Sequence, residues 1–173
     1  MGVKAIFHVE TFYPALRAAC RAAQSEIWLM AYVMSGNMRR KTDPLFVLLK
    51  ILEIKSRQGI DVRIVLDSPK PGRPNFHANR TFSRRLYDFG IPFALPGKFL
   101  TAHAKCACID GALLFCGSHN LTKHSIHNPY DCTVETDSQS AITSYRKYFS
   151  EIWGGTDLIK YPPSKLDFER IYP

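Results

Sequence analysis

A histidine and a lysine separated by one residue form the pair in this sequence best suited to chemistry on a phosphate ester. The pair is His103 and Lys105, and the surrounding residues predict a strand over 103–109. Side chains two apart on a strand point to the same face, so we expect the imidazole and the ammonium to lie side by side. The lysine can hold the negative charge of a phosphodiester while the histidine attacks phosphorus or transfers protons.

A turn and a returning strand follow this pair. Asp110-Gly111 is typical of a two-residue hairpin turn, and a strand is expected over 113–117. Gly117 would permit a close approach of neighbouring backbone. The returning strand would bring Ser118 and Asn120 near the edge that carries the histidine, where both can donate hydrogen bonds to phosphate oxygens.

The complete spacing, His-x-Lys-x4-Asp-x6-Gly-Ser-x-Asn, resembles the signature of the phospholipase D superfamily, in particular its single-motif nuclease branch. The resemblance implies a metal-independent phosphodiesterase without a cofactor, in which one histidine forms a phosphohistidine and a second protonates the leaving oxygen. The other histidines (His8, His77, His119, His124 and His127) lack a lysine two residues later. With one motif per chain, the resemblance implies a homodimer in which both copies of His103 share one site.

The resemblance also implies a carboxylate downstream that holds the nucleophilic histidine through its second nitrogen. Asp131 is the preferred candidate because it follows Asn128 and precedes a hydrophobic strand, and Glu135 is the alternative. These two residues are four apart, so strand alternation gives them the same face and cannot separate them. Asp110 is kept among the catalytic candidates, although Asp-Gly predicts a turn in any fold.

The wider pattern predicts an α/β fold with a mixed, largely parallel β-sheet flanked by helices on both faces. We expect one catalytic domain over residues 1–155 and an irregular tail over 156–173. Asp43-Pro44 predicts the start of a helix that ends at Gly59. Further strands are expected over 4–9, 26–34, 61–67, 91–95 and 132–136, and further helices over 13–24, 76–89 and 138–153.

Composition and charge favour a polyanionic partner. The 173 residues carry a net charge of +8 and are 46% hydrophobic, which suits a globular domain of ordinary composition. Basic residues interleaved with aromatic ones follow a predicted strand end, and others follow the motif. We expect them to bind nucleic acid, either DNA or RNA, although a solvated surface would look similar. These candidates for substrate binding are Arg73, Arg80, Arg84, Arg85 and Lys123.

Two other functions compete with a nuclease. Phe99-Leu100, just before the motif, is the only hint of an apolar loop that could favour a phospholipid substrate. A nucleic-acid-binding nuclease subunit of a larger complex is the second alternative. No apolar run approaches the roughly 20 residues of a spanning helix, so we expect a cytoplasmic protein without stable membrane insertion.

The five cysteines do not predict a disulfide framework, because their number is odd and no secretory context accompanies them. Cys106-x-Cys108 invites a zinc site, but the second pair of ligands that a structural site requires is missing. We therefore expect no metal, and interpret these two residues as small buried thiols on a strand.

Overall fold

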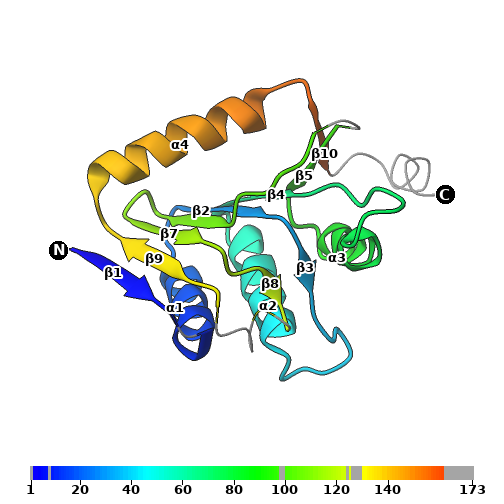
Figure 1. The fold of residues 1–173 in the computed structure, drawn as a ribbon, viewed down its shortest axis with the longest axis horizontal. Coiled ribbons are helices and arrows are strands. Elements are labelled where there is room, and N and C mark those ends of the chain that lie inside the picture. Colours follow the sequence, from blue (N-terminus) through cyan, green and yellow to red (C-terminus); the bar gives the residue numbers. More distant parts are fainter. Residues whose placement is uncertain (1, 8, 98–99, 124, 126–129, 162–173) are drawn as a thin grey trace.

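The computed structural model of the protein describes residues 2–7, 9–97, 100–123, 125 and 130–161, and it is built on an eight-stranded sheet (Figure 1). The strands follow the spatial order β1-β9-β7-β6-β2-β4-β5-β10. Their bounds are β1 Val3–Ile6, β2 Glu26–Ala31, β4 Asp61–Leu66, β5 Phe93–Pro96, β6 Cys106–Ile109, β7 Leu113–Gly117, β9 Thr133–Thr136 and β10 Leu158–Tyr161. A separate pair, β3 Met34–Ser35 and β8 Leu121–Thr122, was not predicted.

The sheet is mixed. Strands β2, β4 and β5 pair in parallel, whereas β6, β7, β9 and β1 continue the sheet through antiparallel pairs and β10 closes the other edge antiparallel to β5. Following these pairings, five of the eight strands (β1, β7, β2, β4 and β5) run in one direction. The α/β class predicted from the sequence is confirmed.

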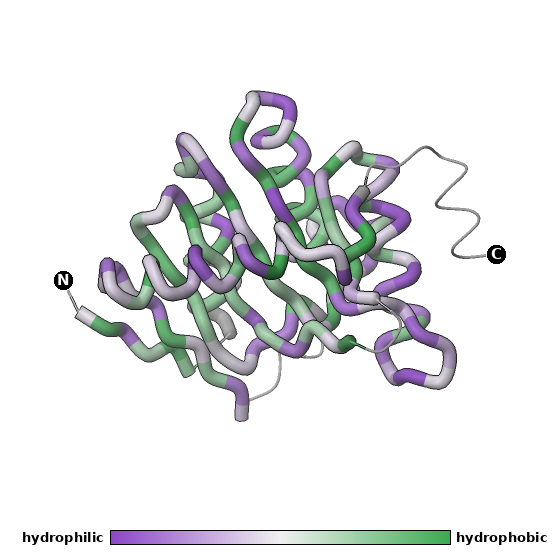
Figure 2. Tube along the Cα trace, turned by 90° about the horizontal axis from the view of Figure 1, so that it is seen from above, coloured by the Kyte–Doolittle hydropathy of each residue, from purple (hydrophilic) through white to green (hydrophobic). Residues whose placement is uncertain are grey.

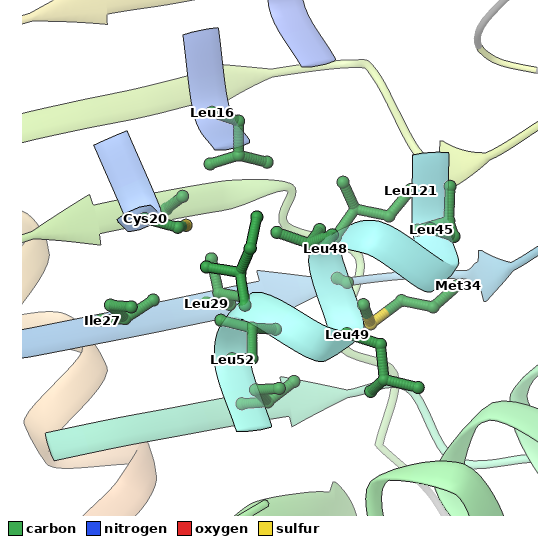
Figure 3. Close-up of a cluster of buried hydrophobic side chains, with 14 of the residues drawn as sticks. Leu16, Cys20, Ile27, Leu29, Met34, Leu45, Leu48, Leu49, Leu52 and Leu121 are labelled. Carbon is green, nitrogen blue, oxygen red and sulfur yellow. The ribbon is translucent and has the colours of Figure 1, made fainter. Parts of the chain in front are cut away.

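Helices cover both faces of this sheet, as predicted (Figure 1). Helices α1 Val9–Ala22, α2 Pro44–Arg57 and α3 Phe76–Asp88 pack on one face, and α4 Gln139–Gly154 packs on the other. Figure 3 shows how α1 and α2 present Leu16, Cys20 and the leucines of α2 to Ile27 and Leu29 of β2. The helices carry both hydrophobic and hydrophilic stretches in Figure 2, which suits elements with one buried face.

Local signals explain where several elements begin and end. The Asp43 side chain accepts a hydrogen bond of 2.9 Å from the Leu45 backbone N–H, so it caps α2 as predicted. At the far end of α2, Gly59 takes a positive φ of +84°, which glycine adopts at little cost. Helix α1 begins at Val9, earlier than the predicted 13, and contains Pro14. The prediction rested on the helical spacing of Leu16, Ala19, Cys20 and Ala23, a pattern that begins only after Tyr13.

Two segments differ from the expectation. The tail was expected to be irregular, but its residues 158–161 form β10, because they pair with the open edge of β5. Residues 162–173 lie outside the described part of the chain. Strand β6 begins at Cys106 rather than at His103. Met30 is the last residue of β2 paired with β6, so the chain before Cys106 has no partner on that side.

Candidate active site

The hairpin of β6 and β7 positions the motif. Its turn residues Asp110 and Gly111 have φ values of +54° and +59°, the left-handed conformations that a type I′ turn requires. The pairing continues past the end of β6, because the Gly117 N–H donates a 3.1 Å hydrogen bond to the Lys105 carbonyl. The two halves of the motif therefore leave the sheet at the same edge.

Motif residues from both halves meet in an open depression at this edge. It is lined by residues from the end of β2, the segment before β6, the end of β7 and the segment before β9, namely Tyr32, His103, Lys105, Gly117, Ser118, Asn120 and Asp131. The structure thus brings together most of the catalytic candidates, and it adds Tyr32, which the sequence analysis missed. Only its place directly after a buried strand could have pointed to it.

The His103 ring lies close to both a lysine and a tyrosine, which are also close to each other. Lys105 Nζ lies 3.4 Å from His103 Nδ1 and donates a 2.6 Å hydrogen bond to the His103 carbonyl. The Tyr32 ring centroid is 4.6 Å from that of His103, and Lys105 Nζ lies 5.0 Å from the same tyrosine ring. Partial burial lowers the pKa of Lys105, and the negative charge of Asp131 acts in the opposite direction. An ammonium that has lost part of its hydration is well placed to bind a phosphate oxygen.

Gly117 and Ser118 fix the end of β7 against the chain entering β9. A Cβ at Gly117 would lie 2.2 Å from the Cys132 carbonyl oxygen, so the predicted close approach of backbone is confirmed. The Ser118 N–H donates to the same carbonyl at 2.8 Å, and the Ser118 hydroxyl accepts from the Cys132 N–H at 2.9 Å. In this structure the serine side chain therefore holds backbone while it also lines the depression.

Asn120 and His119 point to opposite sides of the chain. Asn120 lines the depression, and its backbone is held by the Tyr13 hydroxyl and the Ser125 side chain. His119 is 2% exposed and stacks on Phe12 at 4.9 Å. Burial lowers the pKa of His119, which favours the neutral ring, while the charge of Asp131 opposes this. His119 is thus part of the core rather than a second nucleophile.

The two carboxylate candidates lie in different places. Asp131 lines the depression together with His103 and Lys105. Glu135 lies within β9, opposite Lys4 of β1, and its carboxylate is 3.8 Å from Lys4 Nζ. It lines a different hollow on the surface. Strand alternation would have placed both carboxylates on the same face. It does not apply here, because Asp131 precedes β9 and only Glu135 lies within it.

Asp110 does not reach the depression. It lies in the turn at the opposite end of β6, where its carboxylate accepts hydrogen bonds from the backbone N–H groups of Gln24, Ser25 and Glu26 and from the Ser25 hydroxyl. Burial alone would raise the pKa of Asp110, but these hydrogen bonds lower it below its usual value. We therefore assign Asp110 to the junction between α1 and β2 instead of to the chemistry.

A buried polar network, missed by the sequence analysis, supports the segment before His103. Asp67 is 3% exposed, and its carboxylate accepts hydrogen bonds from the Ala102 N–H at 2.9 Å and from Asn75 Nδ2 at 2.8 Å. Asn79 Nδ2 donates to the carbonyls of Asp67 and Tyr32, both at 2.8 Å. The network thus holds the backbone beside two residues of the depression. Its sequence signal was weak, because only a polar residue at a strand end and two asparagines one helical turn apart mark it.

The basic candidates on α3 are partly engaged with other side chains. Arg84 and Arg85 lie 3.1 Å and 3.8 Å from the Asp88 carboxylate. Arg80 is exposed and lies 5.9 Å from the Phe76 ring centroid, so a basic residue and an aromatic ring are neighbours as the interleaved sequence suggested. Pairing with Asp88 reduces the charge that this helix can offer to a polyanion.

The remaining basic candidates lie on loops. Arg73 is exposed in the turn that precedes α3, and Lys123 is exposed after β8, close in sequence to Asn120. Lys70, from the same loop as Arg73, donates a hydrogen bond to the Leu100 carbonyl. This contact ties the loop after β4 to the segment that leads to His103.

Neither a metal centre nor a spanning helix is found in the part of the chain that the structure describes. No group of three or more His, Cys, Asp or Glu side chains there could hold a metal ion. None of the helices in the described ranges has the length and apolar character needed to cross a bilayer.

Comparison with known proteins identifies the family. The family described as cardiolipin synthase, PLD-like domain, matches residues 16–153. The chain belongs to the phospholipase D superfamily. It is similar to a phospholipase D family member, Nuc, from Salmonella typhimurium, with a TM-score of 0.70 and 20% identity over 94% of this chain and 99% of that one. NucT from Helicobacter pylori gives a TM-score of 0.72 with 16% identity, over 92% of this chain and 99% of NucT.

A curated relative carries a different name. The cardiolipin synthase of Halalkalibacterium halodurans is 31% identical over 108 residues, which cover 60% of this chain and 21% of the relative. The aligned region of this phospholipase D superfamily chain therefore spans about a fifth of that relative's length.

Proposed function

We propose that this protein is a metal-independent phosphodiesterase that hydrolyses nucleic acid through a phosphohistidine at His103. The observation that carries the proposal is the depression, where His103, Lys105, Asn120 and Asp131 converge from separate segments. An imidazole, an ammonium, an amide and a carboxylate around one open site can supply the nucleophile, the charge stabilisation and the orientation for phosphoryl transfer through a histidine.

Each side chain has a defined task in this proposal. One ring nitrogen of His103 attacks phosphorus, and Asp131 accepts a hydrogen bond from the N–H of the other ring nitrogen and so fixes the tautomer. Lys105 and Asn120 hold the non-bridging oxygens as negative charge grows on them. The bond from phosphorus to the leaving oxygen breaks, and that oxygen takes a proton from a second histidine. The second histidine, now neutral, then takes a proton from a water molecule, which attacks phosphorus, breaks the P–N bond of the phosphohistidine and restores the imidazole.

The second histidine is proposed to come from a second copy of the chain. Six histidines occur in the sequence, and only His103 has a lysine two residues later. His119, although next to Asn120, is buried against Phe12 and cannot reach the depression. A two-fold axis beside the depression would place the two copies of His103 on opposite sides of one phosphate.

Charge and aromatic groups favour nucleic acid as the substrate. The net charge of +8 attracts a polyanion. Arg73 is exposed on the loop that Lys70 links to Leu100, just before the motif, and Lys123 is exposed three residues after Asn120. Tyr32 offers an aromatic ring beside the phosphate-binding groups. Stacking of a base on an aromatic ring would position the phosphate next to it.

A phospholipid is the second candidate, because an apolar groove also reaches His103. The groove runs between α4 and the segment that precedes the motif, and its lining includes Met30, Val65, Leu100, Ile152 and Leu158. This apolar lining could accept an acyl chain. A cardiolipin synthase is also among the relatives of this chain. Glu151 and Asp157 also line this groove, and their charges disfavour an anionic lipid there.

The decisive experiment measures cleavage of single- and double-stranded DNA and RNA, and of phosphatidylglycerol and cardiolipin vesicles, in excess EDTA. We expect cleavage of a nucleic acid by the wild type and none by His103→Ala. The matched control is His77→Ala, which removes an exposed histidine of α3 and is expected to remain active. Lipid hydrolysis alone would establish the second candidate, and loss of activity with EDTA would refute a metal-independent mechanism.

Mixing experiments test the shared site. If each site needs two copies of His103, an equal mixture of wild-type and His103→Ala chains that exchange freely retains about one quarter of the wild-type activity at the same total concentration. Independent sites would retain about one half. A result of one half would show that each chain works alone.

A further inference from the structure

Two cysteines face each other across the hairpin that carries the motif. Cys106 is the first residue of β6, and its register partner in β7 is Cys116. Their Sγ atoms lie 3.1 Å apart, with the Cys106 thiol donating to the Cys116 sulfur. In the sequence Cys106 stands nearest to Cys108, whose side chain is buried. The hairpin register, not sequence proximity, creates this pair.

The backbone geometry at this pair is compatible with a covalent bond. The Gly117 N–H bonds to the Lys105 carbonyl, so the hydrogen bonds flank the cysteines rather than join them. Residues at such a non-hydrogen-bonded position have Cα atoms about 4.5 Å apart, inside the range that disulfides span. The sulfur atoms need to approach by about 1 Å from their 3.1 Å separation to reach the length of an S–S bond.

The two thiols are chemically unequal. Cys116 is exposed, and the hydrogen bond from Cys106 lowers the pKa of Cys116 to about 6, against the opposing effect of partial burial. The same contact, together with burial, raises the pKa of Cys106. Cys116 is therefore the thiolate that an oxidant meets first, and Cys106 is the resolving thiol beside it.

We propose that Cys106 and Cys116 form a redox-active dithiol that closes to a disulfide by exchange with a small disulfide such as oxidised glutathione. The Cys116 thiolate attacks one sulfur of the oxidant and releases one glutathione thiolate. The Cys106 sulfur, as its proton leaves to solvent, then attacks Sγ of Cys116 and displaces the second glutathione. The cysteine pair loses two electrons and two protons, and one oxidised glutathione becomes two reduced molecules.

Closure acts on the residues that bind the phosphate. Cys106 is joined to Lys105, and Cys116 is joined to Gly117, which together with Ser118 holds the end of β7 against the Cys132 backbone. A displacement of about 1 Å at catalytic groups can reduce a rate by about 100-fold. The approach of about 1 Å between the two sulfur atoms is divided between β6 and β7, so each strand moves less than the full distance. We therefore expect disulfide formation to lower phosphodiesterase activity at least about tenfold. This effect on activity rests on the proposed function, whereas formation of the disulfide does not.

The other cysteines provide internal controls. Burial raises the pKa of Cys20 to about 12 and that of Cys108 to about 11, so neither competes as a nucleophile at neutral pH. Cys132 is exposed, as Cys116 is. It directly precedes β9, whose first residue, Thr133, pairs with Gly117 of β7. A variant at Cys132 therefore removes an exposed thiol from the same region and leaves the pair intact.

The test exposes the purified chain to oxidised glutathione at neutral pH, then denatures it and alkylates the remaining thiols. Wild type and Cys132→Ser are each expected to lose two reactive thiols to a linkage between Cys106 and Cys116 within one chain, and dithiothreitol should restore both. Cys116→Ser and Cys106→Ser should form no such linkage. A stable glutathione adduct without closure, a linkage to Cys132, or a linkage between chains would overturn the proposal.

Activity is measured on the same samples with bis(p-nitrophenyl) phosphate. Oxidised wild type should lose activity at least about tenfold and regain it on reduction, while Cys116→Ser keeps its activity under both conditions. A fully formed disulfide without a change in rate would overturn the effect on the site. Absence of hydrolysis in the reduced wild type would contradict the proposed function and leave the test by alkylation in force.

Discussion

Removal of the Asp67 carboxylate is expected to weaken both the fold and the site. Its two oxygens accept hydrogen bonds from the Ala102 N–H and from Asn75 Nδ2 in an environment where Asp67 is 3% exposed. A hydrogen bond to a charged group contributes about 1.5–3 kcal/mol, so Asp67→Ala should lower the free energy of unfolding by about 3–6 kcal/mol. Ala102 directly precedes His103, and a displacement of about 1 Å there would reduce kcat by about 100-fold.

The isosteric variant Asp67→Asn separates these effects. Its amide keeps one acceptor oxygen and places an NH2 group against a donor. Asn75 Oδ1 is buried without a hydrogen-bond partner in the described structure, and rotation of that amide would present Oδ1 to the new NH2 group. We therefore expect a loss of about 1–2 kcal/mol and a kcat close to that of the wild type.

The assay combines urea unfolding, followed by circular dichroism, with hydrolysis of bis(p-nitrophenyl) phosphate at concentrations of urea where each variant is folded. If Asp67→Ala is too unstable for kinetics, Asn75→Ala removes one of the two hydrogen bonds and leaves the contact to Ala102. If Asp67→Ala is folded and its kcat equals that of the wild type, the network does not position His103 for catalysis. An unchanged urea midpoint would refute the energetic estimate.

Five further substitutions test the remaining assignments. Gly117→Ala places a Cβ 2.2 Å from backbone oxygen and should cost about 1–3 kcal/mol or more in thermal or urea unfolding. Asp110→Ala should cost about 1–2 kcal/mol at neutral pH, since water replaces part of the lost hydrogen bonds. Asp131→Asn should lower kcat by about 100-fold or more, whereas Glu135→Gln should leave it near the wild-type value. Arg73→Ala should weaken nucleic-acid binding uniformly and reduce the slope of log affinity against log salt by about one.

Acid titration checks the sign of the effect at Asp110. The folded state lowers its pKa, so its contribution to stability is complete above the unfolded pKa of about 3.9 and is lost as the pH falls through the folded value. The difference in unfolding free energy between wild type and Asp110→Ala should therefore be constant at neutral pH and shrink below about pH 4. A difference that grows on acidification would contradict the assignment, as would a large fall in kcat at neutral pH.

Much of the fold could be predicted because its signals are local. Asp43 caps α2, the left-handed residues Asp110 and Gly111 form the turn of the hairpin, and Gly59 and Gly90 take positive φ values at helix ends. Such features depend on one or two residues and their own backbone. Element ends that depend on a partner were less predictable. Strand β6 begins only where β2 can pair with it, and β10 exists because β5 offers an open edge.

The sequence by itself determined the chemistry available to this protein: one histidine, one lysine and one asparagine at the spacing of a phospholipase D motif, in a chain of net positive charge. Only the tertiary structure decided which other groups join them. Strand parity could not separate Asp131 from Glu135, and no local pattern linked Tyr32 or Asp67 to the motif. Nor did any local pattern pair Cys106 with Cys116. These neighbours are set by strand order, register and the ends of strands, which arise from long-range pairing rather than from local backbone preference.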